Sequence, residues 1–197
     1  MTSTHVYIRG SALAAALAAA ACLAVTAGTA GARPRAACAN ARRPVRTLSL
    51  AAVRASVLCL INQQRTERGL PPLRNNRRLD RVAEHWSGWM VAHRDFSHGS
   101  NWTARFGAVG YQWQTAAENI ASGPRTPAAL VRAWMRSRFH CRNILYPGFS
   151  DVGLGETLGV IGRRIRGGAT WTQDFGLPLF AFPASQNTRP MNGCPYA

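Results

Sequence analysis

Four short blocks, each joining a polar side chain to apolar anchors, constrain the fold of this chain more than its composition does. In chain order they read FSH at 96–98, AENI at 117–120, HCRNIL at 140–145 and TWTQDF at 170–175. A polar side chain set among apolar neighbours has to find a hydrogen-bond partner when it is buried. We therefore expect Asn119, Asn143 and Gln173 to satisfy buried backbone groups.

Residues 1–32 have the pattern of a secretory signal. Arg9 supplies the positive charge, residues 11–27 form an apolar run rich in Ala and Leu, and Ala30-Gly31-Ala32 offers a cleavage site between small residues. The run is too short and too rich in Ala for a membrane span, so we expect no transmembrane helix in the mature protein. A lipid-modified Cys22 is the alternative, although the three alanines before it match that signal poorly.

After the signal we predict three segments. Residues 33–47 form a basic arm rich in Arg, Ala and Pro, residues 48–180 form one domain, and residues 181–197 form a tail that contains Cys194. A chain of 197 residues with 47% hydrophobic content is long enough to bury one core. The four cysteines that remain after cleavage imply disulfides in an exported domain, and they allow three pairings.

The net charge of +16 raises nucleic-acid binding as a hypothesis. The arginines are scattered, however, and no zinc-finger, RNA-recognition or helix-turn-helix pattern is present. The chain has no lysine, and all eight acidic residues lie between Glu67 and Asp174. We therefore expect no specific nucleic-acid partner, and only weak adhesion to anionic lipid, teichoic acid or acidic glycan at low salt.

Hydrophobic periodicity predicts helices followed by a hairpin, which is the α+β class. Helix boundaries are indicated by Gly69 as a stop, by Asn75 or Asn76 as a cap, and by Thr126-Pro127 as a start signal. The predicted elements are helices at 48–69, 76–93, 101–110 and from Thr126 to His140, and a hairpin formed by residues 152–161 and 169–175.

Three side chains in these blocks could do chemistry together: His98, Glu118 and His140. Two imidazoles and a carboxylate are a set that zinc accepts, with water completing a tetrahedral shell. The same trio could provide acid–base or nucleophile-activating chemistry. A third interpretation is purely structural, because a buried His–Glu ion pair can hold a loop against a helix. Sequence separations do not decide whether the three side chains meet.

The order and wording of the blocks resemble the CAP superfamily of secreted proteins, and its small bacterial branch in particular. The resemblance extends from about Leu58 to Gly176 and includes the motifs LIN at 60–62, GLPPL at 69–73 and AWM at 133–135. It implies a three-layer α-β-α sandwich, with helices on both faces of a small antiparallel sheet. It also implies that His98, Glu118 and His140 meet in one cavity.

Eukaryotic members of this superfamily carry two His and two Glu in that cavity. Matched by motif, His98 and Glu118 stand for the first of each, His140 stands where the second Glu is usual, and Thr170 where the second His is usual. Cys141 and Cys194 are unusual for the superfamily, so the resemblance favours pairing them with each other, and Cys38 with Cys59.

The resemblance implies a secreted, extracellular protein, and we expect a monomer. The preferred functional hypothesis is a binding module. Its cleft would hold a divalent cation, zinc, on His98, Glu118 and His140, with Thr170 and the three amides nearby, and its surface would contact lipid, sterol or cell-envelope material. The alternative is a secreted hydrolase, a peptidase, that uses the same trio. Neither a GxSxG nor an HExxH motif supports that alternative.

Overall fold

The computed structural model describes residues 37–162, 166–182 and Cys194. The predicted signal, Cys22 and nearly all of the predicted tail lie outside these residues. The described chain contains the 3₁₀ helix η1 (Val45–Thr47), the helices α1 (Leu50–Thr66), α2 (Arg77–His93), α3 (Ala104–Ala108), α4 (Pro127–Met135) and α5 (Arg138–Ile144), and the strands β1 (Arg74–Asn75), β2 (Trp113–Ser122), β3 (Asp151–Leu158) and β4 (Ala169–Pro178).

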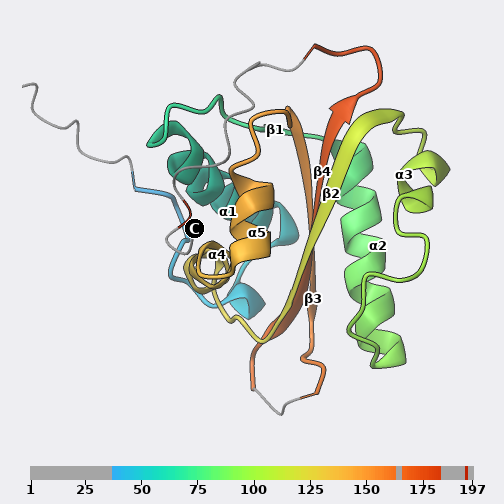
Figure 1. Ribbon diagram of the computed structural model, residues 1–197. Helices are drawn as coiled ribbons and strands as arrows, with labels where there is room; N and C mark the ends of the chain where they lie inside the picture. Colours follow the sequence, from blue (N-terminus) through green and yellow to red (C-terminus); the bar gives the residue numbers. More distant parts are fainter. Residues whose placement is uncertain (1–36, 163–165, 183–193, 195–197) are drawn as a thin grey trace, which may run out of the picture. The chain divides into compact units, whose positions relative to one another are not determined.

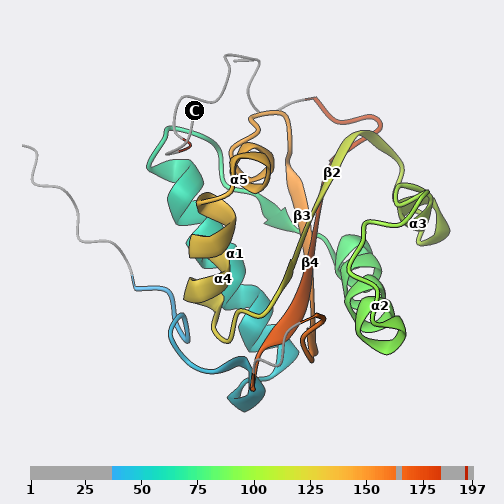
Figure 2. The ribbon, with the colours of Figure 1, turned by 60° about the horizontal axis from the view of Figure 1, so that its bottom comes forward.

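These elements form three layers (Figures 1 and 2). The middle layer is one four-stranded sheet with the order β1-β3-β4-β2, which leaves β2 at an edge. Helices α2 and α3 lie on one face, and α1, α4 and α5 lie on the other. The α+β class and the three-layer arrangement predicted above are confirmed.

The sheet follows the predicted hairpin, with one difference. Strands β3 and β4 pair antiparallel, and β2 pairs antiparallel with the other side of β4. Strand β1 has only two residues and pairs parallel with β3, so the sheet is mixed rather than purely antiparallel. This strand was not predicted, because two residues are too few to show an alternating pattern.

Helix starts follow the capping signals in the sequence. The Asn76 side chain accepts a hydrogen bond from the Arg78 backbone N–H at the start of α2. The Thr126 hydroxyl accepts from the Ala129 N–H at the start of α4, with Pro127 in the first turn. Such caps satisfy backbone donors that have no partner inside the helix.

The helix predicted from Thr126 to His140 is wrong in one respect. Helix α4 ends at Met135, and the chain turns before the separate helix α5 begins at Arg138. His140 therefore lies in the first turn of α5 and does not close the Trp134 helix. The apolar spacing ends with Met135, and the polar residues that follow it allow the turn.

Helix α2 lies directly against the sheet because two strand residues lack side chains. A Cβ atom added to Gly153 would collide with the backbone of Leu79 and Asp80, and one added to Gly155 with the backbone of Ala83 and Glu84. Glycine is required at such close approaches of two backbones. This contact fixes the position of α2 on the sheet, and with it the position of the loop that follows the helix.

The opposite face carries the larger core. It gathers apolar residues of α1, α4, α5, β3 and β4, among them the fully buried Trp134, Trp171 and Phe175. Two disulfides join segments on this side, Cys38 to Cys59 and Cys141 to Cys194, which confirms the favoured pairing. None of the described helices is both long and apolar enough to cross a membrane.

Arg65 is a fully buried arginine at the end of this core. Its guanidinium donates hydrogen bonds to the backbone carbonyls of Pro71, Ile144 and Tyr146, and a longer one to that of Phe149. Burial lowers the pKa of Arg65 to about 10. The side chain thereby holds the turn after α5, which forms part of the cleft described next.

Candidate functional site

The centre of the site is the carboxylate of Glu118, which is buried in the middle of β2. Its Oε1 lies 2.7 Å from Nδ1 of His98, and its Oε2 accepts a hydrogen bond from the Arg105 guanidinium. The Glu118 side chain is 1% exposed, whereas the His98 side chain is 49% exposed. The pair therefore joins a buried negative charge to an imidazole that solvent can reach.

The loop that carries His98 is held on α2 by aromatic and backbone contacts. The indole N–H of Trp86 donates to the Ser97 carbonyl at 3.0 Å, and Arg105 donates to the His98 carbonyl at 2.9 Å. The Arg105 guanidinium also lies 3.9 Å from the centre of the Trp86 ring, in a cation–π contact. Arg105 thus positions both members of the His98–Glu118 pair.

His140 approaches the site from the other face of the sheet, together with three amide side chains. Asn119 donates to the backbone carbonyl of His140 and to Oε1 of Gln173. Asn143 donates to Oδ1 of Asn119 at 2.8 Å. The prediction that these amides satisfy buried backbone groups is confirmed for Asn119, whose bond to the His140 carbonyl ties α5 to β2. Asn143 makes a longer contact of 3.4 Å to the Glu118 carbonyl, whereas the amide nitrogen of Gln173 has no partner among the described residues.

Two adjoining hollows follow the edge strand β2, and His98 and His140 line both. The first, which we call the polar hollow, is about 570 Å³ in volume and is also lined by residues 115–118, Phe139, Arg142, Asn143, Tyr146 and Phe149. The second, the apolar hollow, is about 640 Å³ in volume and is also lined by Phe96, Ser97, residues 120–124, Ala133, Trp134 and Ser137.

Asp174 is a second buried carboxyl beside Glu118. The two residues are direct cross-strand partners in the β2–β4 ladder, and Asp174 has no exposed surface. Neither of its oxygens has a hydrogen-bond partner among the described residues. Burial raises the pKa of Asp174 well above its ordinary value, and the Glu118 charge raises it further, while Arg105 opposes the shift.

The pKa of His140 is lowered, whereas that of Asp174 is raised. Burial lowers its pKa below the ordinary value for histidine, and the neighbouring His98 lowers it further. The neutral form of His140 is therefore favoured at neutral pH.

Comparisons with known proteins identify the family of this chain and agree with its fold. The family model of the CAP domain, described as the cysteine-rich secretory protein family, matches residues 58–158, about half of the chain. The chain belongs to the CAP family. A CAP relative is YkwD of Bacillus subtilis, itself an uncharacterised protein, which is 35% identical over 131 residues. That match covers 64% of this chain and 48% of YkwD, so this CAP chain corresponds to about half of its relative.

Solved structures with the CAP fold are similar as well. An extracellular protein containing an SCP domain from Bacillus anthracis has a TM-score of 0.54 at 25% identity, over 66% of this chain and 44% of that one. An outer surface protein of Borrelia burgdorferi has a TM-score of 0.54 at 18% identity, over 62% of this chain and 90% of that one. At that identity the second likeness shows the fold alone.

The CAP cleft does not have the three-ligand geometry that we predicted for zinc. No three His, Cys, Asp or Glu side chains of the described chain are placed so that they could hold one metal ion. Both oxygens of Glu118 are occupied, one by His98 and the other by Arg105. The residues therefore do not fit a zinc ion held by His98, Glu118 and His140 together, and zinc binding by the protein stays a prediction.

The CAP cleft also lacks an activated nucleophile in the described part of the chain. No hydroxyl group there hydrogen-bonds to His98 or His140, and its four cysteines are in disulfides. The hydroxyl of Ser122, which lines the apolar hollow, is hydrogen-bonded to the Thr170 hydroxyl and accepts a second hydrogen bond from the Ile161 N–H. The hydrolase alternative thus gains no support from an apparent nucleophile–base pair.

Only some of the predicted site residues line the cleft. His98, Glu118, His140 and Asn143 line the polar hollow, while Asn119 and Gln173 lie buried behind it. Thr170 is also buried, lines neither hollow, and donates to the Gly159 carbonyl at 2.9 Å. Thr170 stands where the second His of the superfamily is usual, but its side chain does not line the cleft.

Sequence reasoning missed Arg105 and Asp174. A carboxylate in an apolar stretch requires a partner, and Arg105, between the FSH and AENI blocks, was a cation available to Glu118. Asp174 is part of the TWTQDF block, but its pairing with Glu118 depends on the strand register, which the sequence does not specify.

Proposed function

We propose that this CAP domain is an extracellular binding module whose apolar hollow accepts the hydrocarbon chain of an anionic amphiphile from the cell envelope. The observation that carries the proposal is a largely apolar cavity of about 640 Å³ that has no acidic side chain on its walls. Cavities of this size and composition suit small-molecule ligands.

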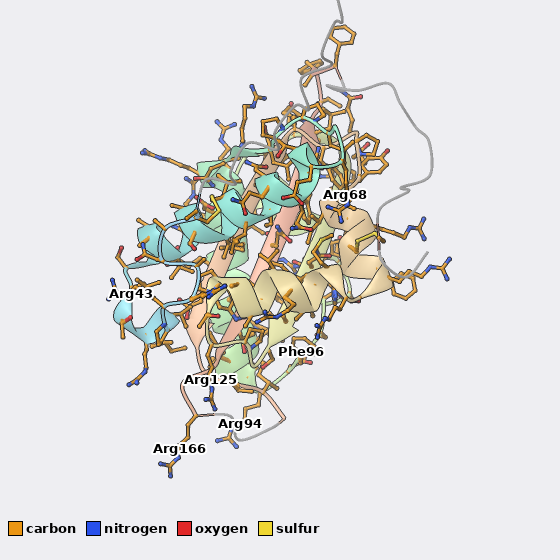
Figure 3. All side chains as sticks on the ribbon, turned by 90° about the vertical axis from the view of Figure 1, so that its left-hand side faces the viewer. Arg43, Arg68, Arg94, Phe96, Arg125 and Arg166 are labelled. Atoms are coloured by element: carbon orange, nitrogen blue, oxygen red, sulfur yellow. A yellow bond between two sulfur atoms is a disulfide. The ribbon has the colours of Figure 1, made fainter. Side chains whose placement is uncertain are left out.

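Exposed arginines surround the opening of the apolar hollow. Arg125 directly follows Pro124, and Arg94 is two residues before Phe96, both of which line the hollow. Arg166 belongs to the β3–β4 turn, which reaches the same place because Gly168 lies against the Gly123 carbonyl. Figure 3 shows Arg94, Arg125 and Arg166 near Phe96 at one end of the molecule.

This arrangement matches the two parts of an anionic amphiphile. The apolar walls remove hydrocarbon from water, which contributes about 0.8 kcal/mol for each buried CH₂ group. Guanidinium groups at the opening pair with a phosphate or carboxylate headgroup. The buried carboxylate nearby, Glu118, is already paired with the guanidinium of Arg105, which reduces its repulsion of an anion.

Binding to lipid vesicles tests the proposal. We expect the chain to bind phosphatidylglycerol vesicles, and to bind phosphatidylcholine vesicles at least about tenfold more weakly. Ala133→Trp fills the apolar hollow from α4 and should abolish binding, whereas Ala108→Trp on α3, where Ala108 is also exposed, should leave it unchanged.

Two results would contradict the proposal. Equal binding by the Ala133→Trp and Ala108→Trp proteins would show that adhesion is a general effect of the +16 charge. Equal binding to the two kinds of vesicle would remove the role of the arginines. Calorimetric titration with zinc, comparing the wild type with His98→Ala and His140→Ala, tests the metal prediction separately.

A further inference from the structure

No strand of the described residues pairs with the outer edge of β2, which borders both hollows. Strand β2 is ten residues long and lies last in the sheet order, so β4 covers only one of its two edges. Strand edges of this length usually carry a proline, a bulge or charged residues that prevent pairing with another chain. The register of β2 is irregular between Trp113 and Thr115, but the segment 115–122 pairs regularly with β4 and contains no proline. Its one charged residue, Glu118, is paired with Arg105 and His98.

Alternate residues of β2 direct their backbone groups outward. In an antiparallel strand, the N–H and C=O of one residue point to the same side, and the next residue points to the other. The Gly123 N–H donates to the Ala169 carbonyl next to β4, so the odd-numbered residues face β4. Ala116, Glu118 and Ile120 therefore present their backbone groups to the outer edge.

Few other groups compete for this edge. The Glu118 carbonyl receives only a long contact, 3.4 Å, from Asn143, and the Ile120 carbonyl one of 3.5 Å from Trp134. Contacts of this length are weak hydrogen bonds. The half-buried Ala116 and Ala117 have side chains too small to cover the backbone, and both line the polar hollow.

The opposite wall of the polar hollow suits an extended chain. Phe139 of α5 is 73% exposed and lines the hollow, which gives an apolar surface for alternate side chains of a ligand. Arg142 of α5 also lines the hollow, whose one acidic lining residue, Glu118, is already paired with Arg105. The Arg142 guanidinium therefore complements a carboxylate and would repel a basic segment.

We propose that the β2 edge binds an extended acidic peptide of a partner protein by strand addition, with its backbone bonded to Ala116 and Glu118 and a carboxylate facing Arg142. This partner goes beyond the proposed amphiphile, because it occupies the polar hollow rather than the apolar one. Main-chain bonds supply affinity in this mode of recognition, and pockets for alternate side chains supply specificity.

Selection from a displayed library of random peptides, each about seven residues long, tests the proposal. We expect the mature chain to select peptides rich in acidic and β-branched residues. The best peptide is then made in two N-methylated forms, with methyl groups on alternate residues in one register or the other. Strand addition predicts that one form loses at least about tenfold in affinity and the other keeps most of it.

Matched variants locate the binding edge. Ala116→Pro removes the outward N–H of β2 without removing a bond to β4, and should weaken peptide binding at least about tenfold. Ala116→Ser is the control, because it changes the same side chain and keeps the outward N–H. Arg142→Glu should weaken binding to a similar extent, whereas Arg132→Glu on α4 should not. If Ala116→Pro fails to fold, the two N-methylated peptides still decide the question.

Several outcomes would overturn the inference. The first is that the library yields no binders, and the second is that both N-methylated forms bind equally. The third is a wild-type dimer in sedimentation that Ala116→Pro converts to a monomer, since a second copy would then occupy the edge. Vesicle binding is measured separately, so a failure of the amphiphile proposal would leave these results unaffected.

Discussion

The two faces of the sheet differ in the kind of polar side chain that they bury. On the face covered by α1, α4 and α5, one continuous apolar core surrounds neutral amides such as Asn119 and Gln173. On the face covered by α2 and α3, two smaller apolar clusters flank the carboxyls Glu118 and Asp174. Glu118 and Asn119 are neighbours in sequence but face different layers, because strand residues alternate between faces. Stability is therefore concentrated on the first face, and ionisable chemistry on the second.

The largest expected effect tests the first face. Arg65→Met should lower the free energy of unfolding by about 4 kcal/mol, because it leaves several buried carbonyls without a donor. Urea denaturation of the wild type, of this variant and of Arg81→Met, which replaces an exposed arginine, measures the difference. A loss below about 1 kcal/mol would mean that water replaces the guanidinium and that this end of the core is loosely packed.

The next effect tests how closely the second face is packed. Gly155→Ala should destabilise the protein by about 3 kcal/mol, because the new Cβ collides with the α2 backbone at Ala83. Gly107→Ala is the matched control, since nothing lies within 4 Å of the added atom. It lies inside α3, so it should be neutral or stabilise the protein by up to about 1 kcal/mol. Thermal unfolding of both variants gives the comparison, and equal behaviour would show that α2 can move away from the sheet.

The smallest effect concerns the charge on the second face, and it depends on pH. The pKa of Asp174 is raised in the folded state, so the folded protein retains a proton that the unfolded chain releases above about pH 4. Asp174 therefore costs stability increasingly as the pH rises from that value towards its folded pKa. Asp174→Asn should be more stable than the wild type at neutral pH, and this gain should vanish near pH 3.

Unfolding in urea across this pH range measures the Asp174→Asn effect. Asp95→Asn, at an exposed position, should show no comparable trend. If Asp174→Asn instead lowered stability at neutral pH, an ionised Asp174 would have to be paired with a cation in the folded protein.

Much of the helical framework on both faces could be predicted from the sequence, because helix periodicity and capping residues are local signals. The stop near Gly69, the Asn76 cap and the Thr126-Pro127 start all agree with the structure. The site was less predictable, because it depends on which residues face each other across β2 and β4. His98 and Glu118 could be singled out, but their contact was implied only by family resemblance, and Asp174 was not recognised.

The position of the second disulfide has a consequence for how this protein is produced. Cys141 lies in α5, the short helix that forms a wall of the cleft, and it is bonded to Cys194, close to the end of the chain. A protein expressed in a reducing cytosol would lack this bond and its restraint on the helix. Such material would keep its β-sheet but would lack a covalent restraint on the α5 wall of the cleft. Recombinant material is therefore best made by export through an oxidising compartment, with a thiol assay completed before any binding experiment is interpreted.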